Sequence, residues 1–237
     1  MPTTILLPLL LGSAFALQPP GQFHGDEPVA RDGERWLALR IDGDDAALVA
    51  TTVQVQAVED VIAGDESGQR SGRLVGSNAG DDAHLVTYLR GPGLQAGAIE
   101  RAQVVASASA LTTLPVHDLT FRGQRHRIDA RCDPAPFEHV DEQAHYACRI
   151  ALDNARGVQV LATTIGYFEA GASTMSLGDA AAPQLLFAGD LDRDGELDLI
   201  FDITDHYNVS RPALFLSSQA TPGALLGEAA RYESVGC

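Results

Sequence analysis

Four aspartates and one glycine in the run from residue 190 to 198 have a spacing suited to binding a cation. Asp190, Asp192, Asp194 and Asp198 occupy positions 1, 3, 5 and 9 of this loop, and Gly195 occupies position 6. Four carboxylates so close along the chain repel one another unless a cation lies among them. Calcium takes six to eight oxygen ligands in a loose geometry, which alternate side chains of a tightly turned loop can supply. We therefore expect one bound calcium ion.

The loop is not a complete EF-hand. The carbonyl of Glu196, at position 7, is the expected backbone ligand, and its side chain is expected to point to solvent. Position 12 is Phe201, so the bidentate glutamate of an EF-hand is missing. The flanking runs 185–187 and 197–201 are apolar and typical of strands. The alternative is an acidic turn without metal; with metal, we expect a structural ion whose binding stabilises the fold.

A second group of potential ligands is Glu138, His139, Asp141, Glu142 and His145. His and carboxylates suit transition metals, so a metal site in the loop 139–145 is one alternative. Their spacing matches no zinc motif, and a solvated polar loop is favoured.

A turn is also expected at Asp205, His206 and Tyr207, because Asp and Asn are frequent there. An acid–base pair of Asp205 and His206 would require a pocket that the sequence does not show. Tyr207, with His206, is our first candidate for contact with a partner, and Tyr167 is the second. No nucleophile elbow, His-Glu-x-x-His helix or phosphate loop occurs, which favours a binding protein over an enzyme.

The charge narrows the choice of partner. The chain has 16 basic and 32 acidic residues, giving a formal net charge of −16, and every basic residue is Arg. Such acidity argues against nucleic acid or an anionic membrane as partner. It suits a cationic partner, a divalent metal or simple solubility.

The first residues resemble a secretory signal. An apolar run, 5–11, precedes the small-x-small triplet Ala14-Phe15-Ala16, which predicts a signal peptide 1–16 cleaved after Ala16. The apolar run is far shorter than the ~20 residues that a membrane span needs. We expect an exported, periplasmic or secreted protein with a flexible lead-in, 17–33.

Three cysteines in an oxidising compartment allow one disulfide. Cys132 and Cys148 flank a polar insertion and adjoin strand-like segments, so they are the expected pair. Cys237 is either the spare thiol or a partner of one of the others.

Apolar and polar residues alternate along most of the chain, which predicts an all-β or mostly β fold of antiparallel sheets, as a sandwich or propeller-like. A turn is expected at 154–157, a weak helical pattern at 94–102, and a long loop or subdomain boundary at 64–82. The β-rich domain is expected at 34–237, with 34–82 and 83–237 as two potential subdomains. Expected strands lie at 36–41, 49–58, 84–90, 103–108, 119–129, 145–153, 158–164, 184–188, 197–203, 213–217 and 230–235.

The acidic loop resembles the calcium loop of FG-GAP repeats, although a single copy does not make a propeller. The runs 188–195, 205–210, 214–218 and 235–237 are similar to those of exported proteobacterial proteins with one such loop. That group is similar to periplasmic immunity proteins of xanthomonad antibacterial secretion systems, which resemble inhibitors of invertebrate-type lysozyme. The resemblance implies a periplasmic protein that inhibits a basic, lysozyme-like peptidoglycan hydrolase. The Ser-Gly-x-Tyr signature of the inhibitor loop is absent, so no inhibitory residue is implied. A secreted hydrolase and an adhesive surface module are the alternatives.

Overall fold

The computed structural model describes residues 14–78, 84–140 and 143–236 of the chain. Its strands form antiparallel sheets, which confirms the predicted all-β class. The short 3-10 turn η2, Ser217–Gln219, is a helical element that lies wholly within the described ranges. No described helix has the length and apolar character needed to cross a membrane.

The larger sheet has eleven strands in the order β1-β6-β3-β4-β7-β15-β16-β18-β19, with β5 on β4 and β2 on β5. Its strands are β1 (Ala16–Gln18), β2 (Gly21–Phe23), β3 (Arg35–Asp42), β4 (Asp45–Val58), β5 (Gly72–Ser77), β6 (Leu85–Arg90), β7 (Gly97–Arg101), β15 (Gln184–Asp190), β16 (Asp198–Asp202), β18 (Pro212–Leu216) and β19 (Gly227–Arg231).

The second sheet has seven strands in the order β14-β13-β12-β10-β9-β8, with β11 on β12. Its strands are β8 (Gln103–Ser107), β9 (Val116–Phe121), β10 (Gln124–Cys132), β11 (Glu138–Val140), β12 (Gln143–Asn154), β13 (Gly157–Phe168) and β14 (Met175–Leu177). The short strands β17 (Val209–Ser210) and β20 (Ser234–Val235) pair with each other.

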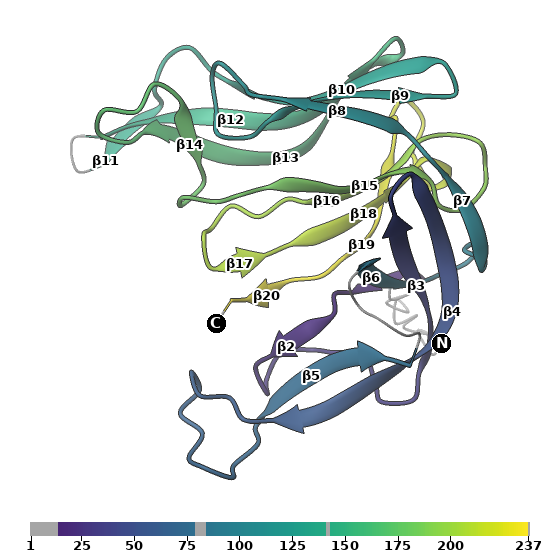
Figure 1. The fold of residues 1–237 in the computed structure, drawn as a ribbon. Coiled ribbons are helices and arrows are strands. Elements are labelled where there is room, and N and C mark those ends of the chain that lie inside the picture. Colours follow the sequence, from purple (N-terminus) through teal and green to yellow (C-terminus); the bar gives the residue numbers. More distant parts are fainter. Residues whose placement is uncertain (1–13, 79–83, 141–142, 237) are drawn as a thin grey trace, which may run out of the picture.

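The two large sheets share a core in the C-terminal part of the chain. The seven-stranded sheet lies across β15, β16 and β18 (Figure 1). Alternate residues of its strands, such as Leu119 and Ile128, are buried against Phe201 and Phe215 of the larger sheet. This alternation is the pattern of a sheet with one face on the core and one in water, and it produces a sandwich.

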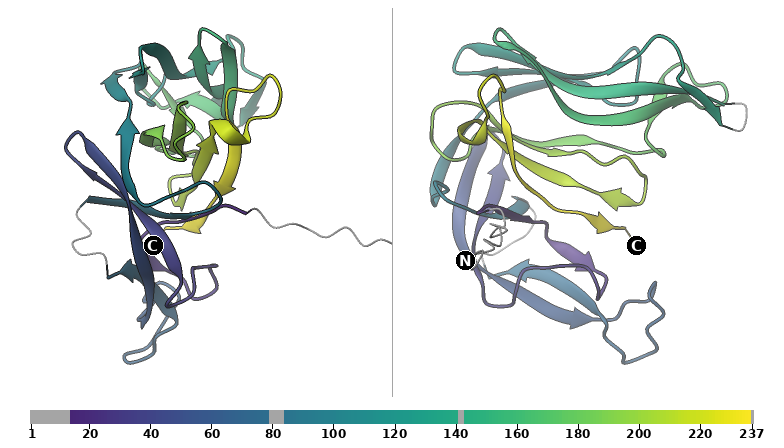
Figure 2. Two further views of the ribbon diagram at one scale, coloured as in Figure 1. Left: turned by 90° about the vertical axis from the view of Figure 1, so that its right-hand side faces the viewer. Right: turned by 180° about the vertical axis from the view of Figure 1, so that it is seen from behind.

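A second hydrophobic cluster lies where the N-terminal strands fold back on β18 and β19. Leu39, Leu48 and Leu89 are completely or almost completely buried there, together with Leu214 and Leu216 of β18. The view from behind shows the long β3–β4 hairpin beside the C-terminal strands (Figure 2). The larger sheet contributes to both clusters, since β15, β16, β18 and β19 supply residues to this second cluster and β15, β16 and β18 also supply residues to the core between the sheets.

Several expected element boundaries were wrong. The weak helical pattern at 94–102 belongs to strand β7, since pairing with β4 and β15 overrides a marginal helix propensity. The long loop at 64–82 contains β5, which is paired with β4 and β2 despite its glycines. The single strand 119–129 is a hairpin that turns at Arg122-Gly123, where both φ angles are positive. The turn at 154–157 is confirmed.

The N-terminal segment is more regular than a flexible lead-in. Strands β1 and β2 both lie in the larger sheet, and Phe15 is only 8% exposed. Phe15 packs at Gly91, where a Cβ would come within 2.1 Å of its ring. Cleavage after Ala16, the first residue of β1, stays a prediction.

The disulfide between Cys132 and Cys148 is present. The two residues lie directly opposite each other on β10 and β12, and Cys148 is 1% exposed. On the neighbouring strand β13, a Cβ at Gly166 would come within 2.5 Å of the Cys148 sulfur, so glycine leaves the room for the bridge. Cys237 lies outside the described residues.

Candidate metal centre

The acidic loop, 190–198, connects β15 to β16, and these two strands pair with β7 and β18 on their outer sides. Asp190 ends β15 and Asp198 begins β16. On one side β15 pairs with β7, placing Asp190 opposite Glu100. On the other side β16 pairs with β18, which continues into η2. The flanking strands were predicted from their apolar runs, and they fix both ends of the loop.

The backbone of the loop is held in a turned conformation. Arg193 and Gly195 both have positive φ angles, 65° and 92°, and glycine adopts such a conformation without steric cost. The Arg193 guanidinium donates to the carbonyls of residues 95, 96 and 98 at 3.1–3.3 Å. The loop is thereby fastened to the segment that leads into β7.

The side chains of Asp190, Asp192 and Asp194 converge. One carboxylate oxygen of each lies within 4.8 Å of the others. Burial decreases along the loop, since Asp190 is buried, Asp192 is half-buried and Asp194 is exposed. Among the residues the structure describes, this is the only group of three potential ligands whose ligand atoms lie within 4.8 Å of one another. The group is open to solvent on one side and closed at Asp190.

Asp190 carries a buried oxygen that lacks a hydrogen-bond partner. Its side chain is 4% exposed, and Oδ1 accepts no hydrogen bond. The other oxygen, Oδ2, accepts from the backbone N–H of Gly195 at 3.0 Å. Such an unsatisfied buried acceptor costs about 1–3 kcal/mol, and more when it is charged. A cation bound at Oδ1 would remove this cost.

The three aspartates fit a hard cation. Calcium–oxygen distances of about 2.3–2.6 Å allow two ligand oxygens to lie up to about 5 Å apart, and the 4.8 Å limit observed here falls within that span. The group contains no His or Cys, the ligands that favour transition metals. The donors present therefore suit calcium or a similar oxygen-seeking ion.

The charge around the loop is unbalanced. Burial raises the pKa of Asp190, and burial together with the negative charges of Asp192 and Asp194 raises the pKa of Asp198 to about 7. One cation partly compensates: Nη2 of Arg122 lies 3.5 Å from Oδ2 of Asp190, and Arg122 also pairs with Glu100 at 2.7 Å. Burial is the main cause of both pKa shifts, and a cation bound beside these carboxylates would favour their ionised form.

Asp198 does not join the other three predicted ligands. It is fully buried, and its two oxygens accept the backbone N–H groups of Leu191 and Ser217, each at 2.8 Å. Its carboxylate therefore connects the loop to the first residue of η2. The Glu196 side chain is 43% exposed and lies 3.5 Å from Arg156. A ligand role for the Glu196 carbonyl stays a prediction.

Three residues around the loop were missed by the sequence reasoning. Arg122 comes from the β9–β10 turn, and its Nη1 donates to the Gly195 carbonyl at 2.9 Å. The hydroxyl of Ser217 donates to Asp194 at 2.6 Å, and that of Ser218 donates to Asp192. All three lie far from the loop in sequence. The serines belong to a run that the family resemblance included, whereas nothing in the sequence marked Arg122.

The turn at residues 205–207 is hydrogen-bonded to Asp179 and presents an aromatic ring. Tyr207 is 70% exposed, and its ring stacks on His206 with centroids 4.6 Å apart. The Tyr207 N–H donates to the Asp179 carbonyl at 2.8 Å, while Nε2 of His206 lies 3.2 Å from the Asp179 carboxylate. Asp205 pairs with Arg211 at 2.6 Å and with no imidazole, so the pair does not form a general acid–base couple.

The remaining candidates lie apart from the acidic loop. Tyr167 is on β13 and packs against His145, with ring centroids 6.0 Å apart. His145 also lies 3.4 Å from Glu138. His139 has an exposed side chain on β11, and residues 141 and 142 lie outside the described residues.

Comparison of the chain with family models, with curated proteins and with solved structures found no match.

Proposed function

We propose that the protein is a calcium-binding protein in which Asp190, Asp192 and Asp194 hold one ion. The observation that carries this is the buried, unpartnered Oδ1 of Asp190 at the closed end of three converging carboxylates. The ion supplies the positive charge that the ionised group lacks, and the hydroxyls of Ser217 and Ser218 border the same site. Its role is structural, because the ion neutralises the carboxylates of the loop that connects β15 to β16.

Isothermal titration calorimetry of metal-stripped protein with calcium tests the proposed site directly. We expect one ion per chain, and a dissociation constant raised at least tenfold in Asp190→Asn, because the buried ligand is weakened. Asp44→Asn, an exposed aspartate in the β3–β4 turn, removes the same charge and should leave the affinity unchanged. Absence of saturable binding at millimolar calcium would rule out the site.

We further propose that the calcium-bound protein is periplasmic and inhibits a basic, lysozyme-like peptidoglycan hydrolase. The supporting observation is Tyr207, an exposed aromatic on a turn that Asp179 holds in place. A preorganised aromatic loses little entropy on binding and is typical of interface hot spots. Asp179 and Asp205 also line an apolar hollow of about 550 Å³ beside Phe137, whose side chain is 55% exposed. Aromatic rings and carboxylates thus lie on one surface, and this surface complements a basic enzyme.

Clearing of purified peptidoglycan by invertebrate-, chicken- and goose-type lysozymes measures the inhibition. We expect equimolar protein to slow at least one enzyme in calcium-containing buffer, and the onset of inhibition to become slower as salt increases. Tyr207→Ala should raise the inhibition constant at least tenfold, about 1.4 kcal/mol of binding free energy. Tyr207→Phe is the matched control, since it keeps the ring. If micromolar protein slows none of the three enzymes, the inhibitor proposal is wrong.

A further inference from the structure

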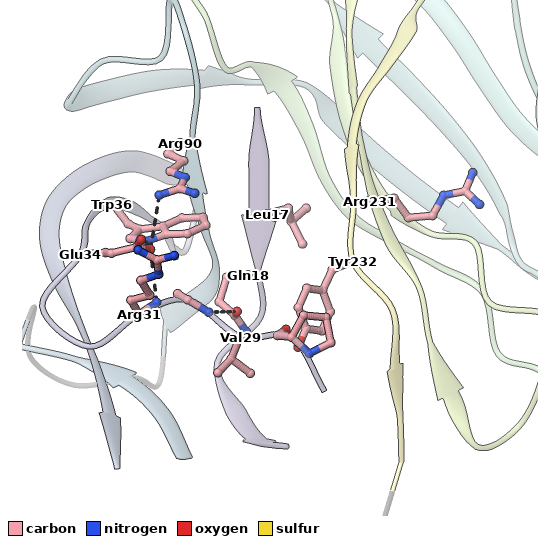
Figure 3. A pocket seen from close by; sticks show the side chains of 11 residues that line it. Leu17, Gln18, Val29, Arg31, Glu34, Trp36, Arg90, Arg231 and Tyr232 are labelled. Carbon is pink, nitrogen blue, oxygen red and sulfur yellow. Dashed lines mark hydrogen bonds and ion pairs between the residues drawn. The ribbon is translucent and has the colours of Figure 1, made fainter. Parts of the chain in front are cut away.

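A cavity of about 540 Å³ lies between the N-terminal strands and the C-terminal strand β19, far along the chain from the acidic loop. Its size is within the range of small-molecule sites, about 300–1,000 Å³. Figure 3 shows Arg31, Glu34, Trp36 and Arg90 together on one side, Tyr232 on the opposite side, and Leu17 with Gln18 between them.

The first side of this cavity is cationic. A single oxygen of Glu34, Oε2, accepts from the Trp36 indole at 3.2 Å and from Arg90 at 3.3 Å. The guanidinium of Arg31 has no carboxylate within ion-pair distance among the described residues. Two guanidinium groups therefore line this side, and one carboxylate, that of Glu34, pairs with Arg90 alone. This local excess of positive charge occurs in a chain whose net charge is −16.

The rest of the lining combines apolar side chains with polar ones that are already paired, including Arg231, which pairs with Glu228 at 2.6 Å. Trp36 is 5% exposed, and Arg90 covers its ring with the guanidinium carbon 4.6 Å from the ring centroid. The Tyr232 hydroxyl donates to the Pro28 carbonyl at 2.8 Å, and burial raises the pKa of Tyr232 to about 12. The buried Gln18 side chain bonds to the backbone of Pro19 and Ala30. These polar atoms are already paired, so Arg31 and the N–H groups of Arg90 that Glu34 does not use are left to orient a ligand.

We propose that this cavity binds a small organic anion in which a carboxylate or phosphate is joined to a ring or another apolar body. The guanidinium groups of Arg31 and Arg90 take the oxyanion, since a planar guanidinium donates two parallel hydrogen bonds to such groups. The apolar body lies over Leu17, in the part of the cavity between the side that carries Trp36 and the side that carries Tyr232. This site is independent of the calcium loop and of the proposed inhibition.

Trp36 is the only tryptophan in the chain, so its fluorescence reports this cavity alone. The probes are 4-nitrobenzoate, 4-nitrophenyl phosphate and the uncharged 4-nitrobenzyl alcohol, whose nitrophenyl ring quenches indole emission on contact. We expect at least one of the two anions to quench saturably, with a dissociation constant below 100 µM, and the alcohol to bind at least tenfold more weakly. The stronger of the two anions distinguishes a carboxylate ligand from a phosphate ligand.

Arg31→Gln should weaken the binding of the anions at least fivefold and reduce the preference over the alcohol. Arg125→Gln is the matched control, because Arg125 is exposed on β10 and the substitution removes the same charge. Circular dichroism spectra and melting curves of both variants verify that each is folded. Linear quenching by both anions, equal affinity for the alcohol, or an unchanged Arg31→Gln variant would each overturn the proposal.

Discussion

Calcium is expected to raise the free energy of unfolding by about 2.7 kcal/mol when the free ion is a hundredfold above its dissociation constant. In the proposed site the ion would bind the folded loop and would have no comparable site in the unfolded chain, so binding would shift the equilibrium toward the native state. The closed end of the site is the unpartnered oxygen of Asp190. We therefore expect a clear rise in melting temperature with calcium over chelator.

The variants Asp192→Ala and Asp194→Ala should lose this rise. Asp194 also accepts the backbone N–H of Glu196 at 2.9 Å, so its variant is expected to melt lower even in chelator. The relevant quantity is the difference between the two melting curves of each variant, measured by circular dichroism. Asp44→Ala should keep the full difference. Coincident curves for metal-stripped wild-type protein with and without calcium would contradict the prediction.

Loss of the Cys132–Cys148 disulfide is expected to lower the free energy of unfolding by about 3 kcal/mol. The two cysteines are 16 residues apart in sequence, and the bridge restricts this segment in the unfolded chain. It also joins two central strands of the seven-stranded sheet, β10 and β12. Ala at both positions preserves a small apolar side chain at the buried site of Cys148.

Urea denaturation of Cys132→Ala/Cys148→Ala, in a Cys237→Ala background that prevents thiol exchange, measures the change. The Cys237→Ala protein is the reference. Peptide mapping after alkylation without reduction should find Cys132 and Cys148 unmodified. Alkylation of both residues would show that the bridge does not form in solution, and equal denaturation midpoints would contradict the expected loss of stability.

The parts of this protein that sequence reasoning found are those with a local signal. Spacing of acidic residues marked the loop 190–198, and apolar alternation marked the strands that flank it. The cysteine pair followed from two neighbouring strand patterns. Short or glycine-rich strands such as β5 and β7 gave no such signal, because pairing with longer neighbours is what keeps them extended.

The site itself was predicted only in part, since it depends on contacts between distant segments. Spacing alone placed Asp198 with the ligands, but complete burial gives its carboxylate to two backbone N–H groups. Arg122 reaches Asp190 only because the β9–β10 turn folds over β15. The cationic cavity brings Arg31, Arg90 and Tyr232 together across the whole length of the chain. No pattern within a single segment of sequence predicts that these distant residues line one cavity.

The two leucines of the acidic loop are buried in different clusters. Leu191 is completely buried among the N-terminal strands, while Leu197 is 4% exposed and packs between the two sheets. The loop therefore cannot move away from the sheet without disturbing the core, because displacing it removes an apolar side chain from one cluster or the other. The free energy of local opening is consequently set by the weaker of the two clusters, and amide hydrogen exchange at the loop reports on that cluster.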